Sequence, residues 1–320
     1  PCRTELRAAL AKVTDLERIA VRIRLGERSP RDLGQLRDGL LAAQPASAAL
    51  AKMPEPERAA LGRLADPLAE LAARLDRALV ERPPPTDKEG GVVQDGFDKQ
   101  LDQQRKRMKG GTEELVALES RLREQTGAPT LRVRYNSVFG WYIEVTKSQL
   151  GKVPKSWHRK QTVAGAERYT NQEVDQLAAD LLAAEERAVL REQALVQLLF
   201  DAVLAELDAI ESLARSLAEW DVFASYAELA ERRDYVRPEV DRGDVIAITE
   251  GRHPVVERFL AAGRFVPNDI TLELGAGRLW LITGPNMAGK STLMRQVALT
   301  VLLAQMGCFV PAKAARVGLV

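Results

Sequence analysis

The sequence has little cysteine, few aromatic residues, no long apolar run and almost no net charge. Its two cysteines, Cys2 and Cys308, match no metal-binding or redox spacing, which favours the reducing cytoplasm. No apolar run approaches the roughly 18 residues of a membrane span, and no signal peptide is recognisable. We therefore expect cytoplasmic localisation and no membrane partner. With 46 Lys and Arg against 45 Asp and Glu, any nucleic-acid site must come from local clustering of charge.

The composition favours long solvated helices over a β-sandwich. Charged residues make up 28% of the 320 residues and aromatic residues only 5%. This length suffices for two domains, or three if some are small. Because the chain starts at Pro1 and not at Met, we expect it to be a piece of a larger protein.

Helical spacing dominates the first third of the chain. Leu16, Ile19 and Ile23 share one face, and in "SPRDLGQLRDGL" Ser29 is expected as an N-cap with Pro30 as the first helical residue. The prolines and glycines of residues 81–96 predict a loop or a domain boundary. A highly charged helix is expected from Phe97 to about Gln125.

The pattern then changes to that of a small β-element between helices. Residues 130–148, with Gly140 in the middle, alternate polar and apolar side chains and predict a hairpin. Residues 153–170 are interpreted as a basic loop that leads back into helix. Residues 171–233 predict one long amphipathic helix or two nearly continuous ones, and a strand-rich region follows from Ile246. The apolar positions that define the helical face are Leu195, Leu199, Val203, Leu207, Ile210 and Leu217.

A phosphate-binding motif lies near the end of the chain. The segment from Gly284 to Ser291 matches G-x-x-x-x-G-K-[ST], with an apolar strand expected at 279–282 and a helix from Ser291 to Leu303. Glycines let backbone N–H groups wrap phosphates, and a helix N-terminus adds partial positive charge. Lys290 can reach the β- and γ-phosphates, and the Ser291 hydroxyl can bind Mg²⁺. The motif predicts ATP and Mg²⁺ as cofactors.

Hydrolysis requires more than this motif. A P-loop ATPase also uses carboxylates from a later strand to hold the metal and the attacking water. The sequence after Ser291 contains no Asp or Glu. We therefore expect the chain to bind ATP without cleaving it.

Several motifs together resemble one family. "EGGVVQDG", "YNSVFGWYIEVTKS", "RKQTVAGAERY", "EGRHPVVE", "FVPNDI" and "TGPNMAGKSTLMRQVAL" are similar, in this order, to segments of the MutS family of DNA mismatch repair ATPases. The resemblance runs over almost the whole chain. It implies a fold that is mainly α with a small β-rich clamp, followed by the beginning of an α/β P-loop ATPase domain. The family's mismatch-reading domain and its Walker B carboxylates have no counterpart in this sequence.

The resemblance also implies four segments. Residues 1–111 would form the first part of the core and lever helices, and 112–175 a clamp that contacts the DNA backbone. Residues 176–236 would form the return part of the lever, and 237–320 the N-terminal part of the ATPase domain.

The resemblance assigns roles to individual residues. Phe265 and Val266 lie where the family packs adenine, and an aromatic ring can stack on a purine, although core packing explains Phe265 equally well from the sequence alone. A lone His253 before a proline more often fixes a turn than acts as a catalytic base. The full set of expected nucleotide-binding residues is Gly284, Pro285, Asn286, Met287, Ala288, Gly289, Lys290, Ser291, Thr292, Phe265 and Val266, with Ser291 as the metal ligand.

Basic residues cluster in the clamp segment. Positive charge near a hairpin suits phosphate contacts that ignore base sequence, although a solvated basic loop is the plain alternative. The expected DNA contacts are Arg132, Asn136, Lys147, Lys155, Arg159 and Lys160.

The function that follows is that of a fragment of a mismatch repair ATPase. It would bind mismatched double-stranded DNA and use ATP binding and hydrolysis to switch to a sliding clamp. A second subunit of a homodimer and a MutL-type repair protein are the partners that the resemblance implies. Two alternatives stay open: an SMC-like long-helix ATPase with a structural arm, and a small-molecule P-loop kinase, for which the long helical preamble has no use.

Overall fold

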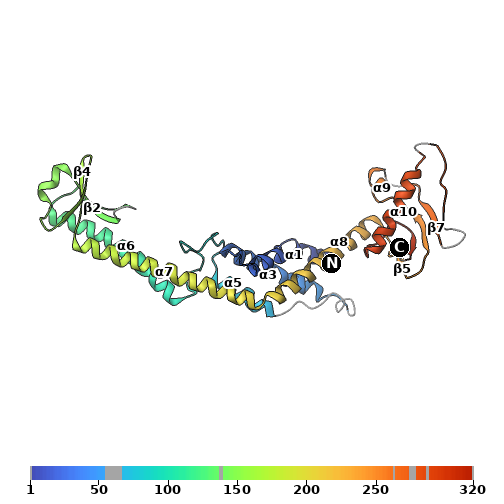
Figure 1. The fold of residues 1–320 in the computed structure, drawn as a ribbon, viewed down its shortest axis with the longest axis horizontal. Coiled ribbons are helices and arrows are strands. Elements are labelled where there is room, and N and C mark those ends of the chain that lie inside the picture. The colour runs from blue at the N-terminus through green and yellow to red at the C-terminus, as the bar shows by residue number, and fades with distance from the viewer. Residues whose placement is uncertain are drawn as a thin grey trace. The chain divides into compact units, whose positions relative to one another are not determined.

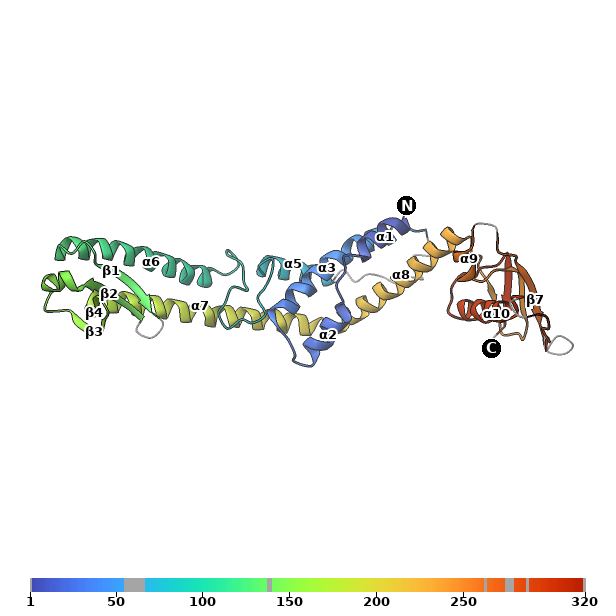
Figure 2. The same ribbon diagram turned by 90° about the horizontal axis from the view of Figure 1, so that it is seen from above.

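The computed structural model describes most of the chain as two compact units. One unit comprises residues 1–12, 42–64 and 213–320, and the other comprises residues 13–41 and 65–212. We call the first the terminal unit and the second the arm unit, and each is treated by itself (Figures 1 and 2). The described residues are 2–54, 67–136, 140–261, 264–273, 279–285 and 288–318. The two units group the chain by contacts, so the four functional segments expected from the resemblance stay a prediction.

Helices supply most of the arm unit. They are α2 (Leu16–Arg24), the first part of α3 (Pro30–Leu50), α5 (Pro67–Ala78), α6 (Lys99–Thr126), α7 (Gln172–Ala205) and the start of α8 (Leu207–Arg233). The predicted apolar positions of α2 and of α7–α8 are all buried. The continuous helical pattern of residues 171–233 resolves into two helices that meet at Glu206.

Side-chain caps explain where these helices start. Asp98 accepts a hydrogen bond from Leu101 N at 2.9 Å at the start of α6, and Asn171 accepts one from Val174 N at 2.8 Å at the start of α7. α3 starts at Pro30 as expected, and Asp32 Oδ2 reaches back to Ser29 N at 2.8 Å. Ser29 Oγ donates to the same Asp32 oxygen at 2.7 Å, so the aspartate at the third helical position supplies one half of a capping box.

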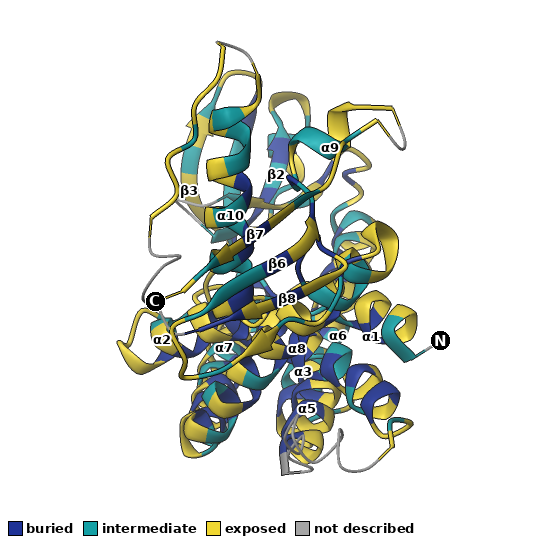
Figure 3. Cartoon of the chain, turned by 90° about the vertical axis from the view of Figure 1, so that its right-hand side faces the viewer, coloured by how far each residue is buried: buried dark blue, intermediate teal, exposed yellow. Residues whose placement is uncertain are grey.

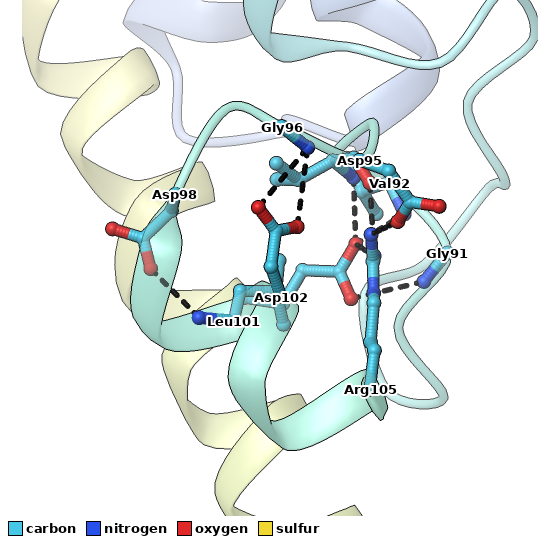
Figure 4. A network of polar contacts seen from close by, with 10 residues as sticks. Gly91, Val92, Asp95, Gly96, Asp98, Leu101, Asp102 and Arg105 are labelled. Atoms are coloured by element: carbon cyan, nitrogen blue, oxygen red, sulfur yellow. Dashed lines mark hydrogen bonds and ion pairs between the residues drawn. The ribbon is translucent and has the colours of Figure 1, made fainter. Parts of the chain in front are cut away.

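The loop of residues 81–96 belongs to the arm unit and is held against α7 by a buried carboxylate. Glu192 on α7 is buried, and its two oxygens face the loop. They accept hydrogen bonds from Gly91 N at 3.1 Å, Val92 N at 2.6 Å, Val93 N at 2.6 Å and Arg105 Nη2 at 3.2 Å (Figure 4). A buried charge is tolerated when it is paired and fully hydrogen-bonded in this way. The segment is thus a fixed loop and not a boundary between the two units.

The first sheet lies beside α6 and α7, which run side by side in both ribbon views (Figures 1 and 2). It is antiparallel, with the strand order β1-β2-β4-β3. Its strands are β1 (Arg132–Asn136), β2 (Gly140–Thr146), β3 (His158–Val163) and β4 (Ala166–Thr170), and the 3₁₀ helix η1 (Lys147–Lys152) follows β2. The β1–β2 hairpin was predicted, although its connecting residues 137–139 lie outside the described residues.

The interpretation of residues 153–170 as a basic loop is wrong, because most of them form the β3–β4 hairpin. Val163 pairs with Ala166, so the strands are joined by two residues, of which Gly165 has φ +93°. A two-residue turn needs a residue with positive φ, and glycine adopts it without strain. The sequence did not predict β3, because its charged side chains do not alternate regularly with apolar ones.

One hydrophobic core joins the first sheet to the two long helices. Ile143 and Val145 of β2 pack with Leu115, Leu118 and Leu122 of α6. Val133, Trp141 and Tyr169 from the same sheet and Leu177 and Leu181 from α7 complete this layer. Burying one face of the sheet in this way sets the register of β1, β2 and β4, since a slip by one residue would expose the apolar set.

The second sheet belongs to the terminal unit and has the order β5-β8-β6-β7. Its strands are β5 (Glu239–Val240), β6 (Ile246–Gly251), β7 (Asn268–Leu272) and β8 (Ala314–Val317). Figure 3 shows β7, β6 and β8 as neighbours. The helices of this unit are α1 (Cys2–Leu10), the end of α3, most of α8, the short α9 (Val256–Phe259) and α10 (Lys290–Gln305). Val297 and Val301 of α10 pack against a core formed by Ile248, Val310 and Val317.

The predicted strand at residues 279–282 is not formed in this structure. The segment has no regular secondary structure, and Leu279 and Leu281 are 84% and 87% exposed. A strand is stable only when its backbone pairs with neighbouring strands and its apolar side chains pack against a second layer. No described strand pairs with this segment. The described residues therefore form a mainly helical chain with two small sheets.

Candidate functional site

The N-terminus of α10 carries the expected phosphate-binding residues. Gly284 has φ +144° and Gly289, the N-cap of α10, has φ +88°, and open space surrounds the position of an added Cβ at both. Such dihedrals turn backbone N–H groups toward one side of a loop, which is how a glycine-rich loop meets an anion. Asn286 and Met287 of the predicted set lie outside the described residues.

The ammonium group of Lys290 lies against the same loop. Its Nζ donates hydrogen bonds to the carbonyl oxygens of Gly284 and Pro285, the latter at 3.0 Å. No carboxylate pairs with Lys290 among the residues that the structure describes. Gly284, Gly289, the N-terminus of α10 and the Lys290 ammonium group therefore lie together, and we call this group the cradle. A helix N-terminus beside a cation is electropositive, which suits a phosphate chain.

The predicted metal ligand is accessible. Ser291 is exposed in the first turn of α10, and Thr292 beside it is partly buried. A single hydroxyl next to bound phosphate oxygens suits Mg²⁺, which is usually held by few protein ligands and by the phosphates themselves. Within the described ranges no three His, Cys, Asp or Glu side chains are grouped as a metal site.

The predicted adenine-binding residues precede β7. Phe265 is partly buried and Val266 is largely exposed. Asn268 Nδ2 donates to Val266 O at 3.1 Å and to Gln296 Oε1 of α10 at 3.4 Å. Gln296 lies six positions after Lys290, about 9 Å along the helix. The loop of Phe265 and Val266 is therefore tied to the same helix that starts with the cradle.

The sequence analysis did not single out Gly251, Asn268 and Gln296, which meet where β6, β7 and α10 pack together. Gly251 ends β6 and is the register partner of Asn268 on β7, and a Cβ at Gly251 would lie 2.6 Å from Gln296 Nε2. Each of the three belongs to a different motif: "EGRHPVV", "FVPNDI" and "GKSTLMRQ". The motifs themselves were the available signal, but only the fold brings them together.

His253 fixes a turn. Its ring is buried, and Nδ1 accepts hydrogen bonds from Val255 N and Val256 N, each at 3.2 Å. Both nitrogens belong to the start of α9, whose N-cap side chain makes no such bond. The structure thus favours the turn interpretation over a catalytic base.

The predicted DNA-contacting residues all lie in or beside the first sheet of the arm unit. Arg132 and Asn136 are on β1, Lys147 starts η1, Lys155 lies in the turn before β3, and Arg159 and Lys160 are on β3. Arg132, Lys147 and Lys155 are exposed, and no carboxylate within the described residues is paired with them.

Other cations of this sheet have acidic neighbours in the chain. Arg159 lies 3.6 Å from Glu167, and Lys160 lies 3.5 Å from Asp175. Glu144 sits between Arg134 at 3.7 Å and Arg168 at 3.8 Å, and Arg168 also covers the ring of Tyr142. These pairs reduce the net positive charge of the sheet. Arg132, Lys147 and Lys155 make no ion pair within the described residues, although Arg132 lies opposite Glu144 in the strand register.

The surroundings of Tyr169 on β4 also show that acidic side chains of this sheet interact within the sheet. Burial and a hydrogen bond to Glu167 raise the pKa of Tyr169 above its ordinary value. Glu167 thus interacts with both Tyr169 and Arg159 and belongs to the internal pairing of the sheet.

Two further observations concern the remaining chemistry. Cys2 and Cys308 are both free thiols, and burial raises the pKa of the Cys308 thiol.

None of the helices in the described part of the chain has the length and apolar character needed to cross a membrane.

Comparisons with known proteins match the two regions just described. A family model described as MutS family domain IV matches residues 96–187, which hold α6, the first sheet and the start of α7. A second model, MutS domain V, matches residues 280–320, which hold the cradle, α10 and β8.

The relatives extend this match over the whole chain. A DNA mismatch repair protein MutS from Sorangium cellulosum is 53% identical, and the alignment covers 99% of this chain and 38% of that protein. Proteins of the same name from Myxococcus xanthus and Anaeromyxobacter dehalogenans are each 46% identical over 99% of this chain and over 36% and 37% of their own length. The chain thus spans little more than a third of these curated relatives.

Proposed function

Because the chain belongs to the MutS family of DNA mismatch repair proteins, we propose that it is a portion of a mismatch repair ATPase that grips duplex DNA and binds ATP. In the whole protein, recognition of a mismatch is followed by ATP binding and hydrolysis that switch it to a sliding clamp. The observation that carries this proposal is the 53% identity to a DNA mismatch repair protein over 99% of the chain.

The nucleotide would bind at the start of α10, in the loop–helix segment that carries the phosphate-binding motif. Backbone N–H groups between Gly284 and Gly289 would hold the phosphates, and Lys290 would exchange its carbonyl partners for phosphate oxygens. Ser291 and the phosphates would hold Mg²⁺, which supplies charge neutralisation on the phosphates. Phe265 and Val266 would cover the adenine. Support comes from the positive-φ glycines, from the position of the Lys290 ammonium against the loop and from the tie between Val266 and α10.

DNA would be held by the first sheet of the arm unit. Lysine and arginine side chains on a small β-element suit phosphate oxygens. Among the described residues of the range 132–170 the only helix is the six-residue 3₁₀ helix η1, which is too short to serve as a recognition helix for the major groove. Contact would therefore be independent of base sequence and would weaken steeply with salt. Support comes from Arg132, Lys147 and Lys155, which are exposed and make no ion pair within the described residues.

The partners and the location are proposed at the level of the family. A second subunit of a homodimer and a MutL-type repair protein would complete the assembly, and the cytoplasm is the proposed location. The matched family models and the relatives give the SMC-like alternative no support.

The deciding experiment is a salt titration of duplex DNA binding. We expect neutralisation of the predicted side chains to weaken binding equally for matched and mismatched duplexes, and to lower the slope of log K against log salt by about one unit for each phosphate interaction removed. Arg159 and Lys160, which have acidic neighbours, should contribute less than Lys147 and Lys155. The variant carries Lys147→Gln, Lys155→Gln, Arg159→Gln and Lys160→Gln.

A matched control removes the same number of positive charges from exposed positions of the same unit, outside the sheet. It carries Lys88→Gln, Lys99→Gln, Lys106→Gln and Lys109→Gln. The control should keep both affinity and slope, and Lys290→Ala should abolish ATP binding while leaving DNA binding unchanged. Equal losses in the two fourfold variants, or a loss confined to mismatched duplexes, would contradict the assignment of the DNA contact to this sheet.

A further inference from the structure

Gln296 of α10 has a fully buried side-chain amide, which lies beside Gly251 at the end of β6. It is 0% exposed, and its Oε1 accepts the hydrogen bond from Asn268 Nδ2. Its Nε2 is buried, is not matched to any hydrogen-bond acceptor in the described structure, and lies at the backbone of Gly251. Burying an amide donor without an acceptor costs free energy of folding, and an apolar side chain of the same size would avoid that cost. The presence of an amide at this position therefore needs an explanation.

The contact made by the other end of the amide supplies that explanation. Asn268 uses one amide group to bond both Gln296 and the carbonyl oxygen of Val266. Residues 264–267 before β7 belong to no helix or strand, and within the described residues this side-chain bond links the backbone of Val266 to α10. A loop held by few backbone hydrogen bonds loses conformational entropy when a ligand orders it, and this loss weakens the affinity for the ligand. A side-chain bond that orders the loop beforehand reduces that loss.

We propose that Gln296 and Asn268 are positioning residues that hold the Phe265–Val266 loop in place to receive the adenine ring, with Gly251 leaving room for the buried amide. The inference rests on the proposed nucleotide site. It makes binding of the base separable from binding of the phosphates. Asn268 bonds the loop directly, Gln296 reaches the loop only through Asn268, and no hydrogen bond joins either side chain to the described residues of the cradle. Gln296→Met keeps the length of the side chain and removes the amide, and Asn268→Ala removes both hydrogen bonds from the less buried side.

The experiment measures binding of Mg²⁺–ATP and of inorganic tripolyphosphate by calorimetry. Tripolyphosphate tests the cradle alone, since it lacks the base and the ribose. We expect both variants to bind ATP about five- to tenfold more weakly, the range that loss of one buried hydrogen bond predicts. Their affinity for tripolyphosphate should stay within about twofold of that of the unsubstituted chain, because tripolyphosphate does not contact the Phe265–Val266 loop. A general loosening of α10 would instead weaken the binding of both ligands.

A matched control changes another glutamine of the same helix. Gln305 is the last residue of α10, at the end opposite the cradle, and its Nε2 donates to Gly318 O at 2.9 Å. Gln305→Met should leave the affinities for both ligands unchanged. If Gln296→Met fails to fold, Asn268→Ala alone decides the question.

The outcomes separate this inference from the proposed function. Unchanged ATP affinity in Asn268→Ala, or a parallel loss for ATP and tripolyphosphate, overturns the positioning role. The positioning role is equally overturned if the unsubstituted chain binds ATP no better than tripolyphosphate. If the unsubstituted chain binds neither ligand better than Lys290→Ala does, the proposed phosphate cradle itself is wrong.

Discussion

Asp98 combines two stabilising interactions in one carboxylate at the start of α6. It caps the helix through Leu101 N, and it receives two hydrogen bonds from the Arg191 guanidinium of α7, from Nε at 3.1 Å and from Nη2 at 2.7 Å. The Arg191 hydrogen bonds, opposed by burial, lower the pKa of Asp98 from 3.8 to about 2. The charged form is therefore favoured in the folded chain.

The first prediction concerns the pH dependence of this contact. A lowered pKa in the folded state means that the carboxylate contributes stability above about pH 4, and that this contribution is lost as the pH falls toward about 2. Asp98→Asn keeps the cap but removes the charge, so it should destabilise the chain by about 1 kcal/mol at pH 7, since solvent screens the partly exposed Arg191. Urea unfolding from pH 7 to pH 2 should show the difference shrinking below pH 4. Asp95→Asn, a change at a nearby exposed ion pair, should have little effect at any pH.

The second prediction uses two neighbouring glycines of α6 that differ in their surroundings. A Cβ at Gly110 would meet nothing within 4 Å, whereas a Cβ at Gly111 would lie 2.5 Å from Leu181 Cδ2 and 3.0 Å from its Cγ. Gly110→Ala should stabilise the chain by about 0.5–1 kcal/mol, because glycine is a poor helix former. Gly111→Ala should destabilise it by about 1 kcal/mol, because the clash with α7 outweighs the same gain. Thermal unfolding of both variants tests this, and equal shifts would mean that α6 and α7 do not pack closely at Gly111.

At the scale of elements, α7 behaves as an amphipathic helix with one face in the core. Leu199 is 1% exposed, whereas its neighbour Leu198 is 51% exposed. This difference follows from the helical period, since adjacent residues point about 100° apart.

The third prediction follows from these two positions. Leu199→Asp should destabilise the arm unit by roughly several kcal/mol, because it places an unpaired charge in an apolar core. Leu198→Asp introduces the same charge in water and should change stability by less than about 0.5 kcal/mol. Denaturant unfolding followed by circular dichroism compares the two variants. A similar loss of stability in both would mean that the buried face of α7 is assigned wrongly.

At the scale of the whole molecule, the two proposed binding sites lie in different compact units. The cradle at α10 is in the terminal unit, and the basic first sheet is in the arm unit. With a net charge of +1, the chain has no global field that would attract DNA to other surfaces. Each site can therefore be tested by substitutions that leave the other unit unchanged.

The last prediction concerns turnover by the whole chain. We expect Mg²⁺–ATP to bind weakly and to remain uncleaved, because the sequence after Ser291 supplies no carboxylate to position a metal or a water. A coupled phosphate-release assay should give the background rate for the unsubstituted chain and for Lys290→Ala alike. Steady release that disappears in Lys290→Ala would show that this chain carries a complete hydrolytic site.

Local patterns were sufficient for the helices and for the first hairpin. The repeat of apolar residues from Leu195 to Leu217 predicted α7 and α8, and the cap at Ser29 and Pro30 predicted the start of α3. The cradle motif, with its glycines and Lys290, was also readable, because one contiguous segment contains it. The helices and the first hairpin depend on residues that are close in sequence, so the sequence by itself determined them. Nucleotide binding by the cradle motif stays a prediction.

Tertiary structure decided what depends on distant residues. The β3–β4 hairpin needed pairing with β2 and a core on α6 and α7 before its charged residues could form strands. Whether Arg159 and Lys160 are free or paired depends on Glu167 and Asp175. Gly251, Asn268 and Gln296 meet because β6, β7 and α10 pack together. The apolar segment at 279–282 shows the converse. It has a strand-like composition, but no strand within the described residues pairs with it, and Leu279 and Leu281 stay exposed.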